Sequence, residues 1–181
     1  MRRTGPLLAA AFLAGCGSVE TKPFVPRAPA APQSVELGWR ELYPAASKRL
    51  VFLVRRLEVG AGGWSVEIGV RNETGIPFDV ERRPGEPGFG VMLFATADLD
   101  EVEAAGRAGT LPAVREAAEL SVPPPSRLRP GASWSTRMSA PGPLPGGAYL
   151  RVAFGPLRAV GEPPEGMQPV VFWITDRSRR L

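Results

Sequence analysis

The chain has 181 residues, a formal net charge of +4 and no histidine. The lack of histidine excludes the Ser-His-Asp and Cys-His catalytic arrangements and the common histidine-containing zinc sites. The 22 basic and 18 acidic side chains nearly balance and form no basic stripe, so no nucleic-acid partner is expected.

The first residues have the layout of a secretory signal. Arg2 and Arg3 precede an apolar stretch that is too short to span a bilayer as a helix. The segment Leu13-Ala14-Gly15-Cys16 follows, and Cys16 is the single cysteine of the sequence. This tetrapeptide resembles the lipobox of bacterial lipoproteins.

The resemblance implies cleavage between Gly15 and Cys16 and attachment of a diacylglycerol to the cysteine thiol. Residues 1–15 are then a signal peptide, and two acyl chains give the remaining chain stable membrane residence. We therefore expect a lipid-anchored protein on the outer face of the cytoplasmic membrane, or on a periplasmic or cell-surface membrane. The alternative is an ordinary signal peptide with an incidental cysteine.

Residues 16–34 have the composition of a tether. Prolines at positions 23, 26, 29 and 32 are three residues apart, which is the repeat of a polyproline II helix. At about 3.1 Å per residue, residues 17–34 could hold a domain up to roughly 55 Å from the lipid. A second interpretation of the same spacing is a proline-rich ligand for a recognition domain.

Residues 35–176 are predicted to form one β-rich domain. In residues 64–71 the apolar Trp64, Val66, Ile68 and Val70 alternate with other residues, which indicates a strand with one buried face. The next residues, Asn72-Glu73-Thr74-Gly75, are predicted to form a turn and also match a glycosylation sequon. Further strands are predicted at residues 50–59, 76–80, 89–94, 134–138, 149–154 and 170–174.

A short helical insertion is predicted at about residues 98–120. Asp98 can cap a first helix with Glu101 three residues later, and Thr110 can cap a second with Pro112 in its first turn. The acids at positions 98, 100, 101 and 103 also begin like a calcium loop, but the glycine and the third alternating acid are missing. No metal and no cofactor is therefore predicted.

Short strands separated by proline and glycine turns indicate an antiparallel β-sandwich. The segments VEIGVRNETGIPFDV, LRPGASW and LPGGAYLRVAFG resemble immunoglobulin-like sandwich domains of bacterial envelope proteins and of a bacillar-type proteinase inhibitor family. We expect Trp64, Trp134 and Trp173 in the core, whereas Trp39 lies outside a clear strand. Residues 177–181 are expected to be a basic, frayed tail.

These features favour a non-enzymatic binding or structural module of the cell envelope, with no catalytic residue. Its expected partners are membrane lipid, through Cys16, and an envelope protein or carbohydrate. One alternative is a protease inhibitor that inserts the loop at residues 82–88 or at 141–147. Another is an enzyme that uses carboxylates such as Asp79, Glu81 or Glu86.

Overall fold

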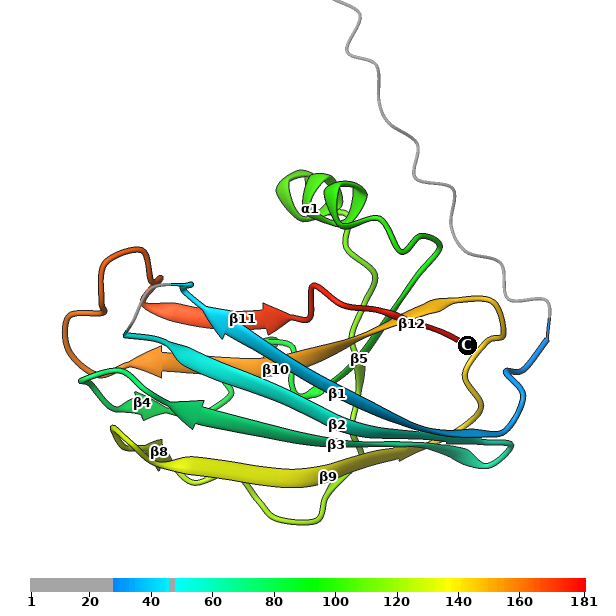
Figure 1. Cartoon of the computed structure of the whole chain (residues 1–181), viewed down its shortest axis with the longest axis horizontal. Helices are drawn as coiled ribbons and strands as arrows, with labels where there is room; N and C mark the ends of the chain where they lie inside the picture. Colours follow the sequence, from blue (N-terminus) through cyan, green and yellow to red (C-terminus); the bar gives the residue numbers. More distant parts are fainter. Residues whose placement is uncertain (1–27, 46–47) are drawn as a thin grey trace, which may run out of the picture.

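The structure, a computed structural model, describes residues 28–45 and 48–181. These residues form an antiparallel β-sandwich, as predicted (Figure 1). The first sheet has five strands in the order β1-β2-β3-β9-β7. The bounds of these strands are β1 Gln33–Tyr43, β2 Leu50–Gly60, β3 Gly63–Asn72, β7 Glu119–Leu120 and β9 Ser133–Pro141.

The second sheet is organised around the long strand β10 (Tyr149–Ala159). Its order is β6-β5-β10-β4-β8, and β11 and β12 also pair with β10. Tyr149 shows the arrangement, because it pairs with Phe94 of β5 and with Arg180 of β12. The remaining bounds are β4 Phe78–Asp79, β5 Gly90–Phe94, β6 Arg115–Glu116, β8 Arg127–Leu128, β11 Val170–Ile174 and β12 Arg179–Arg180.

Aromatic side chains fill the space between the two sheets. Phe52 of β2 contacts Phe154 of β10 with ring centroids 4.9 Å apart, and it stacks on Trp173 of β11 at 5.5 Å. Trp64 and Trp134 are buried, as predicted, while Trp173 is partly buried. Burial of such large apolar surfaces is the main stabilising contribution to a sandwich of this kind.

Trp39 belongs to this core, contrary to the prediction that it lies outside a strand. It is a residue of β1 and is 8% exposed. The sequence pattern is obscured by Gly38, which has a positive φ of 58° at a β-bulge where β1 carries an extra residue opposite β2. Because β1 begins at Gln33, the sandwich starts slightly before the predicted domain boundary at residue 35.

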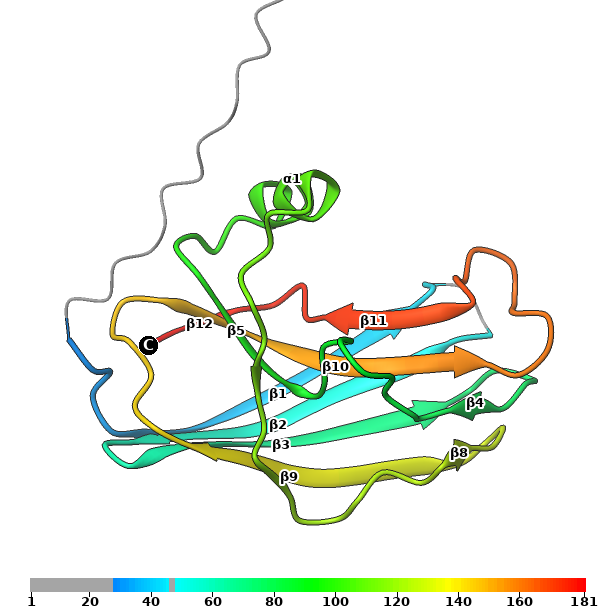
Figure 2. The same cartoon turned by 180° about the vertical axis from the view of Figure 1, so that it is seen from behind.

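The first predicted helix is confirmed as α1 (Leu99–Ala108), which lies outside the two sheets in both views (Figures 1 and 2). Asp98 caps it by accepting a hydrogen bond from the N–H of Asp100 at 2.9 Å. Gly109 ends it in the left-handed conformation, with φ 68°. Val102 is the buried residue of the helix, in a small cluster with Met92, Phe94 and Ala153.

The second predicted helix is wrong, because residues 115–116 and 119–120 form the strands β6 and β7. Arg115 and Glu116 pair with Val91 and Gly90 of β5. Gly90 permits this close pairing, since a Cβ atom there would lie 2.2 Å from the carbonyl oxygen of Arg115. A long-range contact of this kind is invisible to local helix signals.

Proline-rich chain covers the outer edge of the first sheet. After β7, the N–H of Ser121 donates to the carbonyl of Arg137 in β9, and the chain continues along β9 into Pro123, Pro124 and Pro125. The indole N–H of Trp134 donates to the carbonyl of Pro123 at 3.1 Å. The edge strand of this sheet is thus followed by residues that lack a backbone N–H.

Candidate functional site

The predicted lipidation residue Cys16, the cleavage position at Gly15 and the signal peptide at residues 1–15 lie outside the described residues. The structure does describe the end of the predicted tether, from residue 28 onward. We therefore take the place where this segment joins the sandwich as the candidate functional site. It is called the tether end below.

At the tether end, residues 28–30 are packed against the sandwich. The N–H of Ala30 donates to the carbonyl of Leu144 at 2.7 Å, and the N–H of Gly146 donates to the carbonyl of Ala28 at 2.7 Å. Pro29 forms a bridge with Pro145. Ala30 and Leu144 are both buried, so the last part of the predicted tether belongs to the folded domain.

The C-terminus lies at the same place. Leu181 accepts a hydrogen bond from the N–H of Gly147 and donates its own N–H to Ala148, each at 2.8 Å. The β9–β10 loop (residues 142–148) therefore holds both the first described residues and the last ones. β12 pairs with β10, so residues 179–180 are part of the sheet and not a frayed tail.

The burial of Leu144 also bears on the loop at residues 141–147. A loop that enters a protease cleft needs an exposed central side chain, whereas Leu144 is 1% exposed. The loop at residues 82–88 is mostly exposed, and it is held by the ion pairs Arg82–Glu116 and Arg158–Glu86. Of the two predicted inhibitory loops, this one presents its chain to solvent.

The three predicted catalytic carboxylates do not share a cavity. Asp79 accepts two hydrogen bonds from Arg127, at 2.6 and 3.3 Å, and Glu86 pairs with Arg158. The hydrogen bond from each arginine lowers the pKa of its carboxyl partner. Glu81 is exposed. A general acid needs a raised pKa, so Asp79 and Glu86 are poorly suited to that role.

The acids at positions 98, 100, 101 and 103 form the start of α1 and do not surround a common point. Negative side chains in the first turn interact favourably with the helix dipole. Within residues 28–45 and 48–181, no group of three or more Asp, Glu, His or Cys side chains is placed to hold a metal ion.

Two hollows were not foreseen from the sequence. One is an apolar cavity of about 220 Å³ near Phe89, whose polar wall is the Arg82–Glu116 ion pair. The other is a shallow groove of about 730 Å³ over the β2–β3 hairpin and β9. Their lining residues come from separate segments that only the strand register brings together, so no local signal predicts either hollow.

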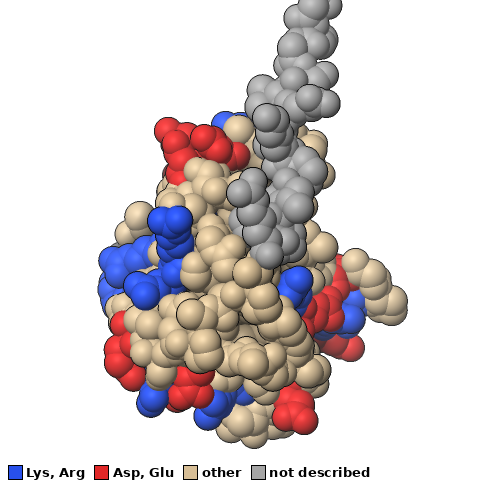
Figure 3. Space-filling view, turned by 90° about the vertical axis from the view of Figure 1, so that its right-hand side faces the viewer, with Lys and Arg blue, Asp and Glu red and all other residues tan. Residues whose placement is uncertain are grey.

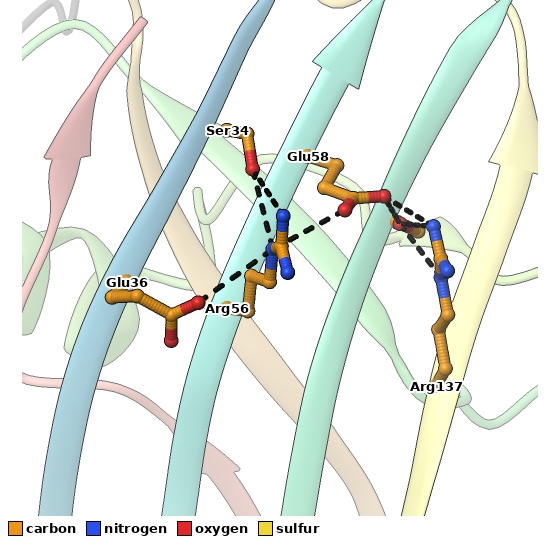
Figure 4. Close-up of polar contacts among 6 residues, drawn as sticks. Ser34, Glu36, Arg56, Glu58 and Arg137 are labelled. Atoms are coloured by element: carbon orange, nitrogen blue, oxygen red, sulfur yellow. Dashed lines mark hydrogen bonds and ion pairs between the residues drawn. The ribbon is translucent and has the colours of Figure 1, made fainter.

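The groove borders a ladder of polar side chains across four strands (Figure 4). Arg56 lies 3.2 Å from Glu58 and 3.6 Å from Glu36, and it donates to Ser34 at 2.9 Å. Arg137 of β9 pairs with Glu58 and donates to Ser65 at 2.8 Å. Exposed ion pairs of this kind contribute little to stability, about 0 to 1 kcal/mol each.

Arginine pairing of surface carboxylates predicts a loss of stability in acid. The pKa values of four carboxyls are lowered, each chiefly by a hydrogen bond from an arginine: Glu73, Asp79, Glu86 and Glu116. Folded, they bind protons less readily than in the unfolded chain, where the ordinary values are 4.5 for Glu and 3.8 for Asp. Their contribution is full above about pH 5 and is lost as pH falls through the lowered values.

The measurement is the Tm followed by circular dichroism across this range. We expect a constant Tm down to about pH 5 and a fall below it, with a smaller fall in the double variant Arg82→Gln/Arg127→Gln. Asp176 acts in the opposite sense, because partial burial and the nearby Glu41 raise its pKa. A Tm that rises steadily on acidification, as Asp176 alone would cause, contradicts the prediction.

No helix in the described part of the chain is long and apolar enough to cross a membrane. Comparison of the chain with protein-family models, with curated proteins and with solved structures found no match.

Proposed function

We propose that this chain is a lipoprotein of the bacterial cell envelope that acts as a non-enzymatic binding or structural module. The observation that carries the proposal is the position of the single cysteine, directly after Leu13-Ala14-Gly15 and a short apolar run. A lone thiol in an exported chain is otherwise exposed and reactive, and a thioether to diacylglycerol removes that reactivity. The partner is an envelope protein or carbohydrate.

The packing of residues 28–30 supports a specific tether length. Residues 16–27 are the part of the chain between the proposed lipid and the first packed residue, and residues 28–34 no longer add reach. At about 3.1 Å per residue, twelve residues span at most roughly 37 Å in a polyproline conformation. The sandwich is therefore held nearer to the bilayer than the 55 Å that the sequence suggests.

The non-enzymatic part of the proposal is supported by the side chains available. The sequence has no histidine, and its single thiol is committed to lipid in this proposal. Asp79 and Glu86 are held in ion pairs by arginines. Hydrolytic turnover by the purified chain on a panel of envelope substrates contradicts this part. A chain that slows serine or cysteine proteases through residues 82–88 favours the inhibitor alternative.

Intact-mass analysis of the chain purified from membranes tests the lipid anchor. We expect loss of residues 1–15 and an added diacylglycerol on Cys16, because the lipobox requires the thiol as nucleophile. The variant Cys16→Ala should keep residues 1–15 and carry no lipid, whereas the matched control Ser18→Ala should be processed like the natural chain. An unmodified Cys16, or a full-length chain recovered from the cell interior, contradicts the proposal.

A further inference from the structure

A group of arginines lies beside the tether end. Arg179 and Arg180 form β12 and pair with Leu150 and Tyr149 at the beginning of β10. The next residue, Leu181, is hydrogen-bonded to the β9–β10 loop, which also holds Ala28. We call Arg177, Arg179 and Arg180 together the C-terminal basic strand.

The C-terminal basic strand is exposed, and its charges are not neutralised by described side chains. Arg177, Arg179 and Arg180 are all exposed, and none of them takes part in an ion pair within residues 28–45 and 48–181. Two acids adjoin the strand: Asp176 precedes Arg177 in the chain, and the buried Glu41 accepts the backbone N–H of Arg177. The strand itself carries three positive charges, one from each arginine.

The acids of α1 do not cover this positive charge. Figure 3 looks onto the tether end, where basic surface gathers on one side, with acidic surface above it at the top and further acidic surface below it. The acids at the start of α1 are Asp98, Asp100 and Glu101. A local basic patch of this kind can be oriented by a plane of opposite charge.

We propose that the C-terminal basic strand contacts the anionic headgroups of the membrane that holds the chain, and thereby orients the sandwich. This inference rests on the proposed function, because the lipid on Cys16 brings the strand close to the bilayer. Each arginine near an anionic surface favours contact about fivefold, and the effect disappears beyond about 8 Å at physiological salt. The tether supplies the high local concentration that makes so weak a contact persist.

The test uses the lipidated chain in phosphatidylcholine vesicles with and without phosphatidylglycerol. Because the lipid blocks Cys16, a single new cysteine can be labelled with a fluorophore. It is placed either at Ser178→Cys, within the basic strand, or at Ser133→Cys, at the end of β9 that is remote from the tether end. Nitroxide-headgroup lipids then report which end of the sandwich touches the bilayer. The charge variant is Arg179→Gln/Arg180→Gln, and the matched control is Lys48→Gln/Arg129→Gln, with the same charge loss remote from the tether end.

We expect quenching at position 178 and not at 133, in anionic vesicles only, and reversed by high salt. The contact equilibrium should fall about 25-fold in the Arg179→Gln/Arg180→Gln variant and stay unchanged in the control. Equal quenching in neutral vesicles, or a charge variant that behaves like the natural chain, overturns the inference while leaving the anchor intact. Absence of lipid by intact mass overturns the proposed function and the inference with it.

Discussion

Replacement of Arg151 by alanine is expected to lower the free energy of unfolding by about 3 to 5 kcal/mol. Arg151 lies near the beginning of β10 and is 0% exposed. Its Nη1 donates to the carbonyls of Thr175, at 2.8 Å, and Asp176, and its Nη2 donates to that of Ala97 at 2.8 Å. Alanine leaves three carbonyl groups without this donor and a cavity beside Phe94.

The loss should be large because Arg151 joins parts of the chain that are distant in sequence. Burial lowers its pKa, while the acids Asp176, Glu41 and Asp98 around it favour the charged form. Glu41 of β1 accepts hydrogen bonds from the indole N–H of Trp173 at 2.8 Å and from the N–H of Asp176 at 3.0 Å. The first strand, the central strand, the C-terminal segment and the entry to α1 thus meet in one network.

Urea unfolding followed by circular dichroism measures this loss. Arg151→Lys keeps the charge but not the planar set of donors, so its stability should lie between those of the natural chain and Arg151→Ala. The matched control is Arg55→Ala, because Arg55 is an exposed arginine of β2 and its loss should cost less than about 0.5 kcal/mol. If Arg151→Ala costs no more than Arg55→Ala, the network does not stabilise the fold.

Replacement of Asn72 by alanine is expected to cost about 3 to 4 kcal/mol. The side chain is 0% exposed at the end of β3. Its amide donates to the carbonyls of Ile76, at 2.8 Å, and Leu128, at 3.0 Å. Its Oδ1 accepts from the N–H of Thr74 at 2.9 Å and from the Thr74 hydroxyl at 2.6 Å. Alanine leaves these buried groups without their partner.

The same unfolding measurement applies to Asn72, with Thr74→Val as the comparison. Valine removes the hydroxyl at position 74 but keeps both donor bonds of the Asn72 amide, so it should cost less than Asn72→Ala. Equal losses would mean that the Asn72 amide contributes nothing of its own. The sequon at 72–74 is therefore explained by turn structure, because the Asn72 amide that a glycan requires is buried and bonded.

The strands could be predicted where burial follows a local pattern. Trp64, Val66, Ile68 and Val70 alternate with polar residues, and all four face the core. The N-terminus of α1 could be predicted for a similar reason, since a cap depends on neighbouring residues. Local chemistry was sufficient in both cases.

The rest depended on contacts between distant segments. Arg151 alternates with apolar residues as an outward-facing side chain would, yet α1 and the cluster around Met92 cover that face of β10. Residues 115–120 carry helix-type charge spacing, but pairing with β5 and β9 decides their conformation. The docking of residues 28–30 was hidden because prolines spaced by three also suit a free tether.

If the proposed lipid anchor confines many copies to one membrane, the prolines that follow β7 limit how neighbouring copies can pair. Confinement to a plane makes neighbouring sandwiches collide edge to edge. An unpaired edge strand of one molecule could then pair with an edge strand of the next. Pro123, Pro124 and Pro125 offer no amide hydrogen to such a neighbour, and the indole of Trp134 already occupies the Pro123 carbonyl. At this edge of the first sheet, the prolines therefore disfavour strand pairing with a second copy.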